Sequence, residues 1–221
     1  MGWRTGRTIA LTIAAAIGFA NPPLLNAQVK TGGEKALRMF DQGMAALERK
    51  DYREARRLFA PLCDAGVGTA CYNLGIMVMN GRGGPVDKTR AANLFLQGCE
   101  ERYSDNADQD SCFNYGLALE KGWTGAPDLS RAVTYYVRAC DLGQPNGCLN
   151  AGNMLLTGRG RAVDLPRALA HLKRGCSLGN GRSCYNAGYA IAVKKAVDPD
   201  GHSPREYLRL ACEAGHEKAC R

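Results

Sequence analysis

The sequence predicts an all-α protein, a right-handed solenoid of αα-hairpins that repeat about every 36 residues and are stapled by disulfides. Three observations support this prediction. Cysteines recur at a fixed period, each cysteine pair sits in the same pattern of polar, apolar and glycine positions, and the alternation of apolar and polar residues typical of β-strands is not seen.

The cysteines define the repeat. The odd-ranked cysteines are spaced 36, 41, 36 and 36 residues apart, and the even-ranked ones 41, 36, 36 and 36. One five-residue insertion between Cys99 and Cys112 explains both departures. The ten positions are Cys63, Cys71, Cys99, Cys112, Cys140, Cys148, Cys176, Cys184, Cys212 and Cys220.

The N-terminus is typical of a secretory signal peptide over residues 1–27. Arg4 and Arg7 form a positive segment, and residues 9–20 form a short apolar core. Cleavage after Ala27 or after Ala20 suits this pattern, because both are small residues. Residues 28–50 then predict a linker and an N-terminal capping helix over 34–50, and residues 51–221 form the repeat region.

The first helix of each unit is predicted from four recurring positions. An aspartate opens the segment as a helix N-cap, and an alanine and a bulky apolar pair follow on one helix face. A glycine with left-handed dihedrals ends the helix. The aspartates are Asp51, Asp87, Asp128, Asp164 and Asp200, and the glycines are Gly66, Gly143, Gly179 and Gly215. In the bulky pair His171–Leu172, we expect His171 to be a packed core residue.

The second helix begins at the second cysteine of each unit. A glycine four residues into it, such as Gly75 or Gly152, allows another helix to approach closely. Gly-x-Gly sequences at 81–83 and 158–160 then close the helix as a loop. Two such helices bury their apolar faces only by stacking on further pairs, and this requirement predicts the solenoid.

These motifs resemble the Sel-one-like repeat family, a relative of the tetratricopeptide repeats. The Cys-Tyr-Asn-Leu-Gly segment at 71–75 and its three copies, the Gly-x-Gly loops and the alanine column carry the resemblance, over about residues 51–221. The cysteines are similar to those of the Helicobacter cysteine-rich proteins. The chain departs from the pattern at the insertion 100–111, at Lys194 in place of glycine, and in the last unit, where Pro204 replaces the alanine.

The repeat leaves two disulfide pairings open. One joins Cys63–Cys71, Cys99–Cys112, Cys140–Cys148, Cys176–Cys184 and Cys212–Cys220, and it uses every thiol. The other runs from Cys71 to Cys99 and onward, and leaves Cys63 and Cys220 unpaired. We favour the first, which the family resemblance also implies. Each bridge closes a short loop worth about 2.5 kcal/mol. Zinc and redox sites favour closer cysteine spacing, so we expect neither a metal nor a cofactor.

A column of asparagines follows the second cysteine. In tetratricopeptide-like folds the helix that carries this segment lines the concave groove. An amide side chain both donates and accepts, so the column can bind the backbone of a peptide in that groove. Alternatively, the same amides tie neighbouring repeats together. The four residues are Asn73, Asn114, Asn150 and Asn186.

Two other polar features are open to a binding role. Arg82, Arg159 and Arg161 lie in the inter-helix loops, where arginines either hold acidic groups or remain solvated. The insertion Glu100–Ser111 carries five acids against one base, and it is either a contact loop or a tolerated surface insertion.

Enzyme motifs are sparse, and no catalytic residue is assigned. Resemblance to the Helicobacter proteins implies penicillin binding with weak β-lactamase activity. Serine β-lactamases use Ser-x-x-Lys, Ser-Asp-Asn and Lys-Thr-Gly. The chain holds Lys30-Thr31-Gly32 and Ser104-Asp105-Asn106, but in reversed order and without Ser-x-x-Lys. We interpret both fragments as coincidence.

Charge and composition restrict the partners. The net charge of +8 becomes +6 once Arg4 and Arg7 are removed, and aromatic residues make up only 7% of the chain, which argues against nucleic acid. No apolar run reaches the roughly 20 residues of a membrane span. We therefore expect a secreted or periplasmic scaffold that binds a peptide, a protein or a peptidoglycan-derived ligand. The alternatives are a β-lactam hydrolase and a mitochondrial intermembrane-space assembly factor, both implied by the family.

Overall fold

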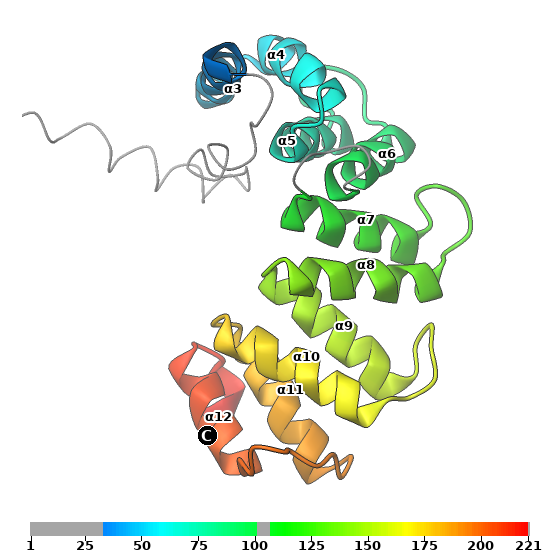
Figure 1. The fold of residues 1–221 in the computed structure, drawn as a ribbon, viewed down its shortest axis with the longest axis vertical. Helices are drawn as coiled ribbons and strands as arrows, with labels where there is room; N and C mark the ends of the chain where they lie inside the picture. Colours follow the sequence, from blue (N-terminus) through cyan, green and yellow to red (C-terminus); the bar gives the residue numbers. More distant parts are fainter. Residues whose placement is uncertain (1–32, 101–106, 221) are drawn as a thin grey trace, which may run out of the picture. The chain divides into compact units, whose positions relative to one another are not determined.

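The computed structural model describes residues 33–100 and 107–220, which form α-helices and one short 3-10 helix (Figure 1). No strand occurs in these two ranges. The elements are α3 (Gly33–Glu48), α4 (Tyr52–Asp64), α5 (Gly68–Met79), α6 (Lys88–Cys99), α7 (Gln109–Lys121), α8 (Leu129–Asp141), α9 (Pro145–Thr157), α10 (Leu165–Ser177), α11 (Gly181–Ala192), α12 (Pro204–Glu213) and η2 (Glu217–Ala219).

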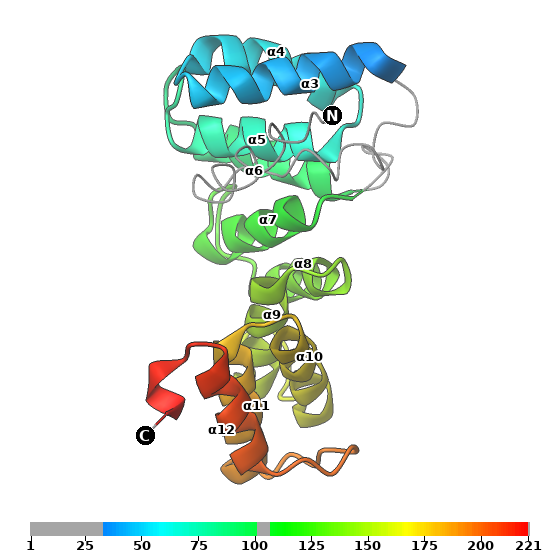
Figure 2. The ribbon, with the colours of Figure 1, turned by 90° about the vertical axis from the view of Figure 1, so that its left-hand side faces the viewer.

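The chain forms two compact units, residues 1–111 and 112–221. In the first, α3 packs on α4, α4 on α5, and α5 on α6 (Figure 2). In the second, each helix from α8 to α12 packs on the next. Successive helix pairs stack in this way as an αα-hairpin solenoid, which confirms the predicted fold class. The helix expected over 34–50 is α3, and it packs on α4 as part of the first hairpin.

The aspartate column caps four helices as predicted. Asp51, Asp87, Asp128 and Asp164 each stand one residue before α4, α6, α8 and α10, and each carboxylate accepts a hydrogen bond from the backbone N–H three residues later. The prediction is wrong for Asp200. Ser203 caps α12 instead, in a reciprocal capping box with Glu206, because Pro204 suits the first helical position and shifts the start of the helix.

The glycine of the second helix receives the bulky side chain of the next helix. A Cβ placed on Gly75 would lie 2.6 Å from the Phe95 ring, and one on Gly152 would lie 2.6 Å from Leu172. In α3, Gly43 stands 2.8 Å from the Phe59 ring by the same measure. The α3–α4 pair therefore uses the packing of the later hairpins.

The Gly-x-Gly loops rest on the preceding hairpin. Gly83 and Gly160 both have positive φ, and a Cβ on Gly160 would lie 2.4 Å from the carbonyl oxygen of Leu129 at the start of α8. The second position of the motif therefore needs glycine for two reasons: its φ is positive, and the backbone of the preceding hairpin leaves no room for a Cβ.

Four of the favoured disulfide pairs are present, namely Cys63–Cys71, Cys140–Cys148, Cys176–Cys184 and Cys212–Cys220. Their Cα–Cα distances of 4.4–4.9 Å suit a bridge between the end of one helix and the start of the next. Cys99 and Cys112 are also disulfide-bonded, and the described residues contain no free cysteine.

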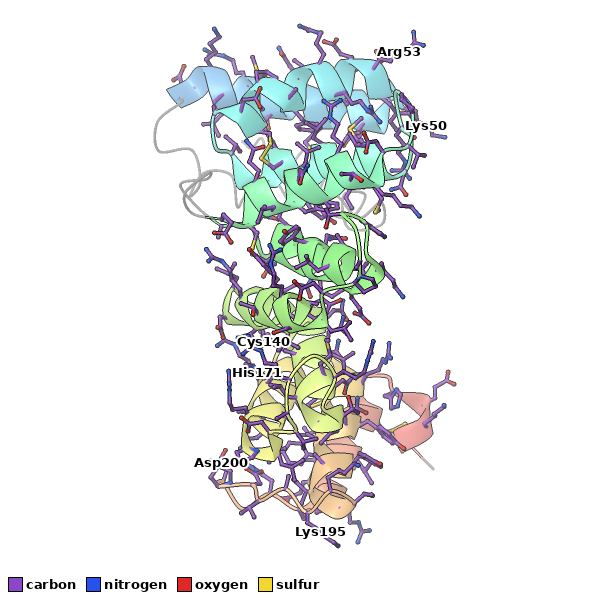
Figure 3. All side chains as sticks on the ribbon, turned by 90° about the vertical axis from the view of Figure 1, so that its right-hand side faces the viewer. Lys50, Arg53, Cys140, His171, Lys195 and Asp200 are labelled. Carbon is purple, nitrogen blue, oxygen red and sulfur yellow. A yellow bond between two sulfur atoms is a disulfide. The ribbon has the colours of Figure 1, made fainter. Side chains whose placement is uncertain are left out.

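The bulky pair of α10 corrects one expectation. Leu172 is fully buried, whereas His171, labelled in Figure 3, is only partly buried. In the pairs of α4, α6, α8 and α10 the second member is fully buried, namely Phe59, Phe95, Tyr136 and Leu172. In α12 the order is reversed, because Tyr207 is buried and Leu208 only partly so. Burial lowers the pKa of His171.

Candidate functional site

The asparagine column lies on α5, α7, α9 and α11, and the structure buries its members to different extents. Asn73 is fully buried, and its amide donates to the sulfur of Met44 on α3. Asn114, Asn150 and Asn186 are partly buried. Asn186 donates to the side-chain oxygen of Asn153 at 2.7 Å, which joins α11 to α9.

These contacts bear on both roles that the sequence left open. Asn73 does not offer its amide to an external ligand in this conformation, so a groove-binding role rests on the other three positions. Those amides lie at the surface edge of their helices, together with Asn153 and the 41% exposed Tyr189 of α11. We name this set of Asn114, Asn150, Asn153, Asn186 and Tyr189 the asparagine row.

A second polar group joins α7, α8 and the α9–α10 loop, and Asn150 of the asparagine row hydrogen-bonds to its central residue, Tyr136. The hydroxyl of buried Tyr136 on α8 donates to Glu120 of α7 at 2.7 Å, and Arg159 of the α9–α10 loop donates to the same carboxylate at 3.1 Å. Burial and the hydrogen bond to Glu120 raise the pKa of Tyr136. The hydroxyl therefore remains protonated and serves as a donor.

The loop arginines are engaged within the chain. Arg159 pairs with Glu120, Arg161 donates to the hydroxyl of Thr134 at 2.7 Å, and the guanidinium of Arg82 lies 5.6 Å from the Tyr52 ring centroid. A shallow depression of about 500 Å³ runs beside Arg161 along residues 161–167. These contacts position the loops against the neighbouring hairpin.

The loop between α11 and α12 carries a cluster that the sequence analysis missed. The ammonium of Lys173 on α10 contacts the carboxylates of both Asp198 and Asp200, and the Tyr207 hydroxyl donates to Asp198 at 2.8 Å. His202 Nδ1 lies 3.3 Å from Asp198. Figure 3 labels Asp200 and Lys195 on this loop. We call Lys173, Asp198, Asp200, His202 and Tyr207 the loop clamp.

Electrostatics hold the clamp in one charge state. Burial opposes ionisation of Asp198, whose side chain is 2% exposed, but hydrogen bonds from Lys173 and Tyr207 keep its pKa well below the usual range. Burial also opposes the charge of Lys173, yet its hydrogen bonds to the two carboxylates raise its pKa. Asp198 is therefore ionised and Lys173 protonated across the physiological range.

Three members of the clamp have the chemistry of metal ligands. Asp198, Asp200 and His202 each place one ligand atom within 4.8 Å of the others. The ammonium of Lys173 already lies against both carboxylates and supplies the positive charge there. The arrangement is suited to holding the α11–α12 loop on α10.

A pocket of about 460 Å³ opens beside the clamp, between α10 and α12. The Cys176–Cys184 disulfide contributes to its wall, as do Lys173, His202 and Tyr207 of the clamp. Its other lining residues are Ser177, Glu206, Leu210, Glu213 and Ala214. The pocket thus combines an apolar stripe with two carboxylates at its edge.

The sequence held one signal of the clamp. The last unit departs from the repeat at Lys194, where glycine is absent, and at Pro204, and both changes flank the loop that carries Asp198 and Asp200. Functional or stabilising features are expected where a repeat breaks its own rules. The contact of Asp198 and Asp200 with Lys173 could not be inferred from the sequence, because it depends on the path of the α11–α12 loop across α10.

Several predicted features lie outside the described residues. They are the signal peptide at 1–27, the Lys30–Gly32 fragment, the Ser104–Asn106 fragment and most of the insertion. The β-lactamase activity, which only the family resemblance implies, stays a prediction that the described residues do not test. In the described ranges, no helix is long and apolar enough to cross a bilayer.

Comparison with known proteins gives a consistent result. The Sel1 repeat model matches five consecutive segments, residues 26–67, 68–103, 109–144, 145–180 and 181–216. The first match includes α3, in agreement with the packing of Gly43 on Phe59. No curated protein matches the sequence significantly.

Two solved structures with TM-scores of 0.70 and 0.75 share the fold at low identity. A Sel1 repeat protein from Oxalobacter formigenes is 21% identical with a TM-score of 0.70, and the alignment covers 82% of this chain and 70% of that one. The protective antigen c5321 of uropathogenic Escherichia coli is 18% identical with a TM-score of 0.75, covering 83% of this chain and 39% of the antigen. Helicobacter pylori cysteine rich protein B is 23% identical with a TM-score of 0.44, covering 70% and 98%.

Proposed function

Because the chain belongs to the Sel1 repeat family, whose repeats are protein-interaction modules, we propose that it is an exported scaffold that binds an extended polypeptide segment of a partner along the asparagine row. The observation that carries this proposal is the register of the row. Asn114, Asn150 and Asn186 occupy the same position of three successive repeats, and all three are partly exposed. An extended peptide presents backbone donors and acceptors that amides can pair with.

The geometry of the row favours such a ligand. The hydrogen bond from Asn186 to Asn153 fixes the orientation of two amide planes, and each amide retains further donor and acceptor capacity. Because the amides are held by helices rather than loops, little conformational entropy is lost when a ligand binds. The exposed ring of Tyr189 at the end of the row adds an apolar contact.

Export is supported by the disulfides. Bridges persist in oxidising compartments, and here they connect the helices of successive hairpins. We propose a periplasmic or secreted location that is reached through the segment 1–27. Expression in a bacterium, followed by N-terminal sequencing of the exported protein, tests this. A mature chain beginning after Ala27 or Ala20 supports export, and an intact Met1 in the cytosol contradicts it.

The binding proposal is tested by capture from an envelope extract with the oxidised protein. The double variant Asn114→Ala/Asn150→Ala should lose captured partners while its melting temperature falls only slightly, through loss of the hydrogen bond between Asn150 and the Tyr136 hydroxyl. Asn93→Ala, on the exposed face of α6, is the matched control. A fall in melting temperature with undiminished capture would instead assign the amides to repeat stacking. Retention on purified peptidoglycan, in place of protein, would show a cell-wall ligand and contradict the polypeptide.

A further inference from the structure

At the α10–α12 pocket, the last repeat lacks a side chain that bridges two helices in two earlier repeats. In α10, Arg174 stands two residues before its cysteine, and it donates to the backbone carbonyl of Asp141 at the end of α8 at 2.9 Å. In α6, Gln97 at the same position donates to the carbonyl of Cys63 at the end of α4 at 3.1 Å. Each of these side chains therefore joins its own helix to the C-terminal end of the corresponding helix in the preceding repeat: α10 to α8, and α6 to α4.

The last repeat has no such donor. Leu210 stands two residues before Cys212, where Arg174 stands before Cys176. Two residues after the same cysteines, Ala214 replaces the larger Leu178. Both Leu210 and Ala214 line the pocket. Leu178 is itself 40% exposed, so the missing guanidinium is the main difference from the preceding repeat.

The pocket also has the electrostatics of a cation site. The last turn of α10 ends at its rim, and the carbonyls of a helix C-terminus carry partial negative charge. Ser177 occupies the position that Asp141 holds in the preceding repeat, where the backbone carbonyl accepts from Arg174. Glu206 and Glu213 add two carboxylates. Lys173, the one lysine of the lining, is already engaged by Asp198 and Asp200.

The two glutamates retain the capacity to accept from a ligand. Glu206 accepts from the backbone N–H and hydroxyl of Ser203, and Glu213 accepts from Arg209 one turn earlier on α12. A carboxylate offers about four lone-pair sites, so each keeps vacant acceptor positions. Leu210 and the ring of Tyr207 supply an apolar surface for the methylene stem of a long side chain.

We propose that this pocket binds an arginine side chain of a basic peptide segment, which takes the place that Arg174 occupies in the preceding repeat. The guanidinium would donate to the end of α10 and to Glu213, and its stem would lie on Leu210. The site suits arginine better than lysine, because a planar guanidinium can donate to a carbonyl and a carboxylate at the same time. The site lies on other helices than the asparagine row, so it goes beyond the function proposed above.

The test is a titration of the oxidised full chain with the blocked peptide acetyl-Ala-Leu-Arg-Leu-Ala-amide, followed by ¹H–¹⁵N NMR. The matched peptide carries citrulline, a neutral isostere, in place of arginine. We expect shifts concentrated at residues 173–177 and 206–214, and about tenfold weaker binding of the citrulline peptide. Equal affinities for the two peptides, or shifts elsewhere only, would overturn the proposal.

Three variants sharpen the result. Leu210→Arg restores the bridging side chain and should abolish binding, whereas Arg174→Leu should open a second site with new shifts at residues 137–141. Glu213→Gln, which leaves helix packing unchanged, should weaken binding, and Glu48→Gln in α3 is the control of equal charge. Unchanged affinity in both Leu210→Arg and Glu213→Gln would contradict the assignment. Asn114→Ala/Asn150→Ala should bind this peptide normally, so the two proposals fail independently.

Discussion

At the scale of single residues, glycine acts here mainly as a packing residue. Gly43, Gly75, Gly116 and Gly152 lie inside helices, where glycine is costly, and each faces a large side chain of the next helix. The sequence indicated a close helix approach from the column alone. It could not give the partner, because that depends on which of two adjacent bulky residues turns inward.

The first prediction concerns Gly152. The variant Gly152→Ala should lower the free energy of unfolding by about 1–3 kcal/mol, because its Cβ would overlap Leu172. Chemical denaturation of the oxidised protein measures this. In Leu172→Ala the added methyl has space, so the double variant should lose less than the sum of the two single losses. Strict additivity would show that the two residues do not compete for the same volume.

Asp108 is a buried acid within the insertion. Its carboxylate accepts from the backbone N–H of Ser111 at 2.6 Å, and its own N–H donates to the carbonyl of Gly98 at 2.8 Å. Burial, and then the negative charge of Asp110, raise its pKa from 3.8 to about 7. The insertion was interpreted as a contact loop or a surface loop, but at Asp108 it is part of the core.

The second prediction follows from this shift. Because the folded state holds the Asp108 proton more tightly than the unfolded chain, the free energy of unfolding should fall as pH rises from 3.8 towards about 7, and then level off. Asp108→Asn keeps an acceptor for Ser111 and should remove this part of the pH dependence. Denaturation at several pH values measures it, and superimposable profiles of the two proteins would contradict the assignment.

At the scale of elements, the starts of the first helices were predictable, with one informative exception. The second helices begin three residues before the cysteines that were expected to open them, at Gly68, Pro145 and Gly181. Four aspartates cap their helices because an aspartate before an apolar-periodic run has the side chain that the first free N–H groups need. Asp200 stands in the same column but faces Lys173. Ser203 as N-cap and Pro204 as first helical residue move the start of α12 away from Asp200, and the period of the repeat does not reveal this shift.

The third prediction compares the caps. Asp164→Ala and Ser203→Ala should each lower the free energy of unfolding by about 1 kcal/mol, because each removes the acceptor at a helix N-terminus. Asp200→Ala should leave α12 capped. Amide hydrogen exchange in the first turn of α12 distinguishes them, and faster exchange in Asp200→Ala than in Ser203→Ala would contradict the structure.

The fourth prediction concerns the loop clamp. Lys173→Met should lower the free energy of unfolding by roughly 2 kcal/mol, between the values of exposed and buried ion pairs. The pKa of Asp198 is depressed, so its contribution is present above 3.8, the ordinary value, and is lost as pH falls below it. Urea denaturation of both proteins at neutral and acid pH measures this, with Lys195→Met on the same loop as the control. An equal loss in both variants would show a general charge effect.

At the scale of the whole molecule, the cysteine period made the architecture predictable. The period defines the repeating helix pair, and four of the bridges join the end of one pair to the start of the next. The asparagine column was equally visible, but its burial was not. Asn73 is enclosed and Asn186 is not, because burial depends on which neighbouring helices cover each position.

Each bridge should stabilise the stack by constraining the unfolded chain. The loops that they close are short, so each is worth about 2.5 kcal/mol, and together they rival the net stability of an ordinary domain. The central claim is that these hairpins hold their stacked form because of the bridges, which ties the protein to an oxidising compartment.

Thermal unfolding of the oxidised chain, recorded by far-ultraviolet circular dichroism with and without a strong reductant, tests that claim most directly. The account predicts that reduction lowers the melting temperature by tens of degrees or removes the cooperative transition altogether. An unchanged melting curve, in a sample whose thiols are shown to be fully reduced, would contradict it.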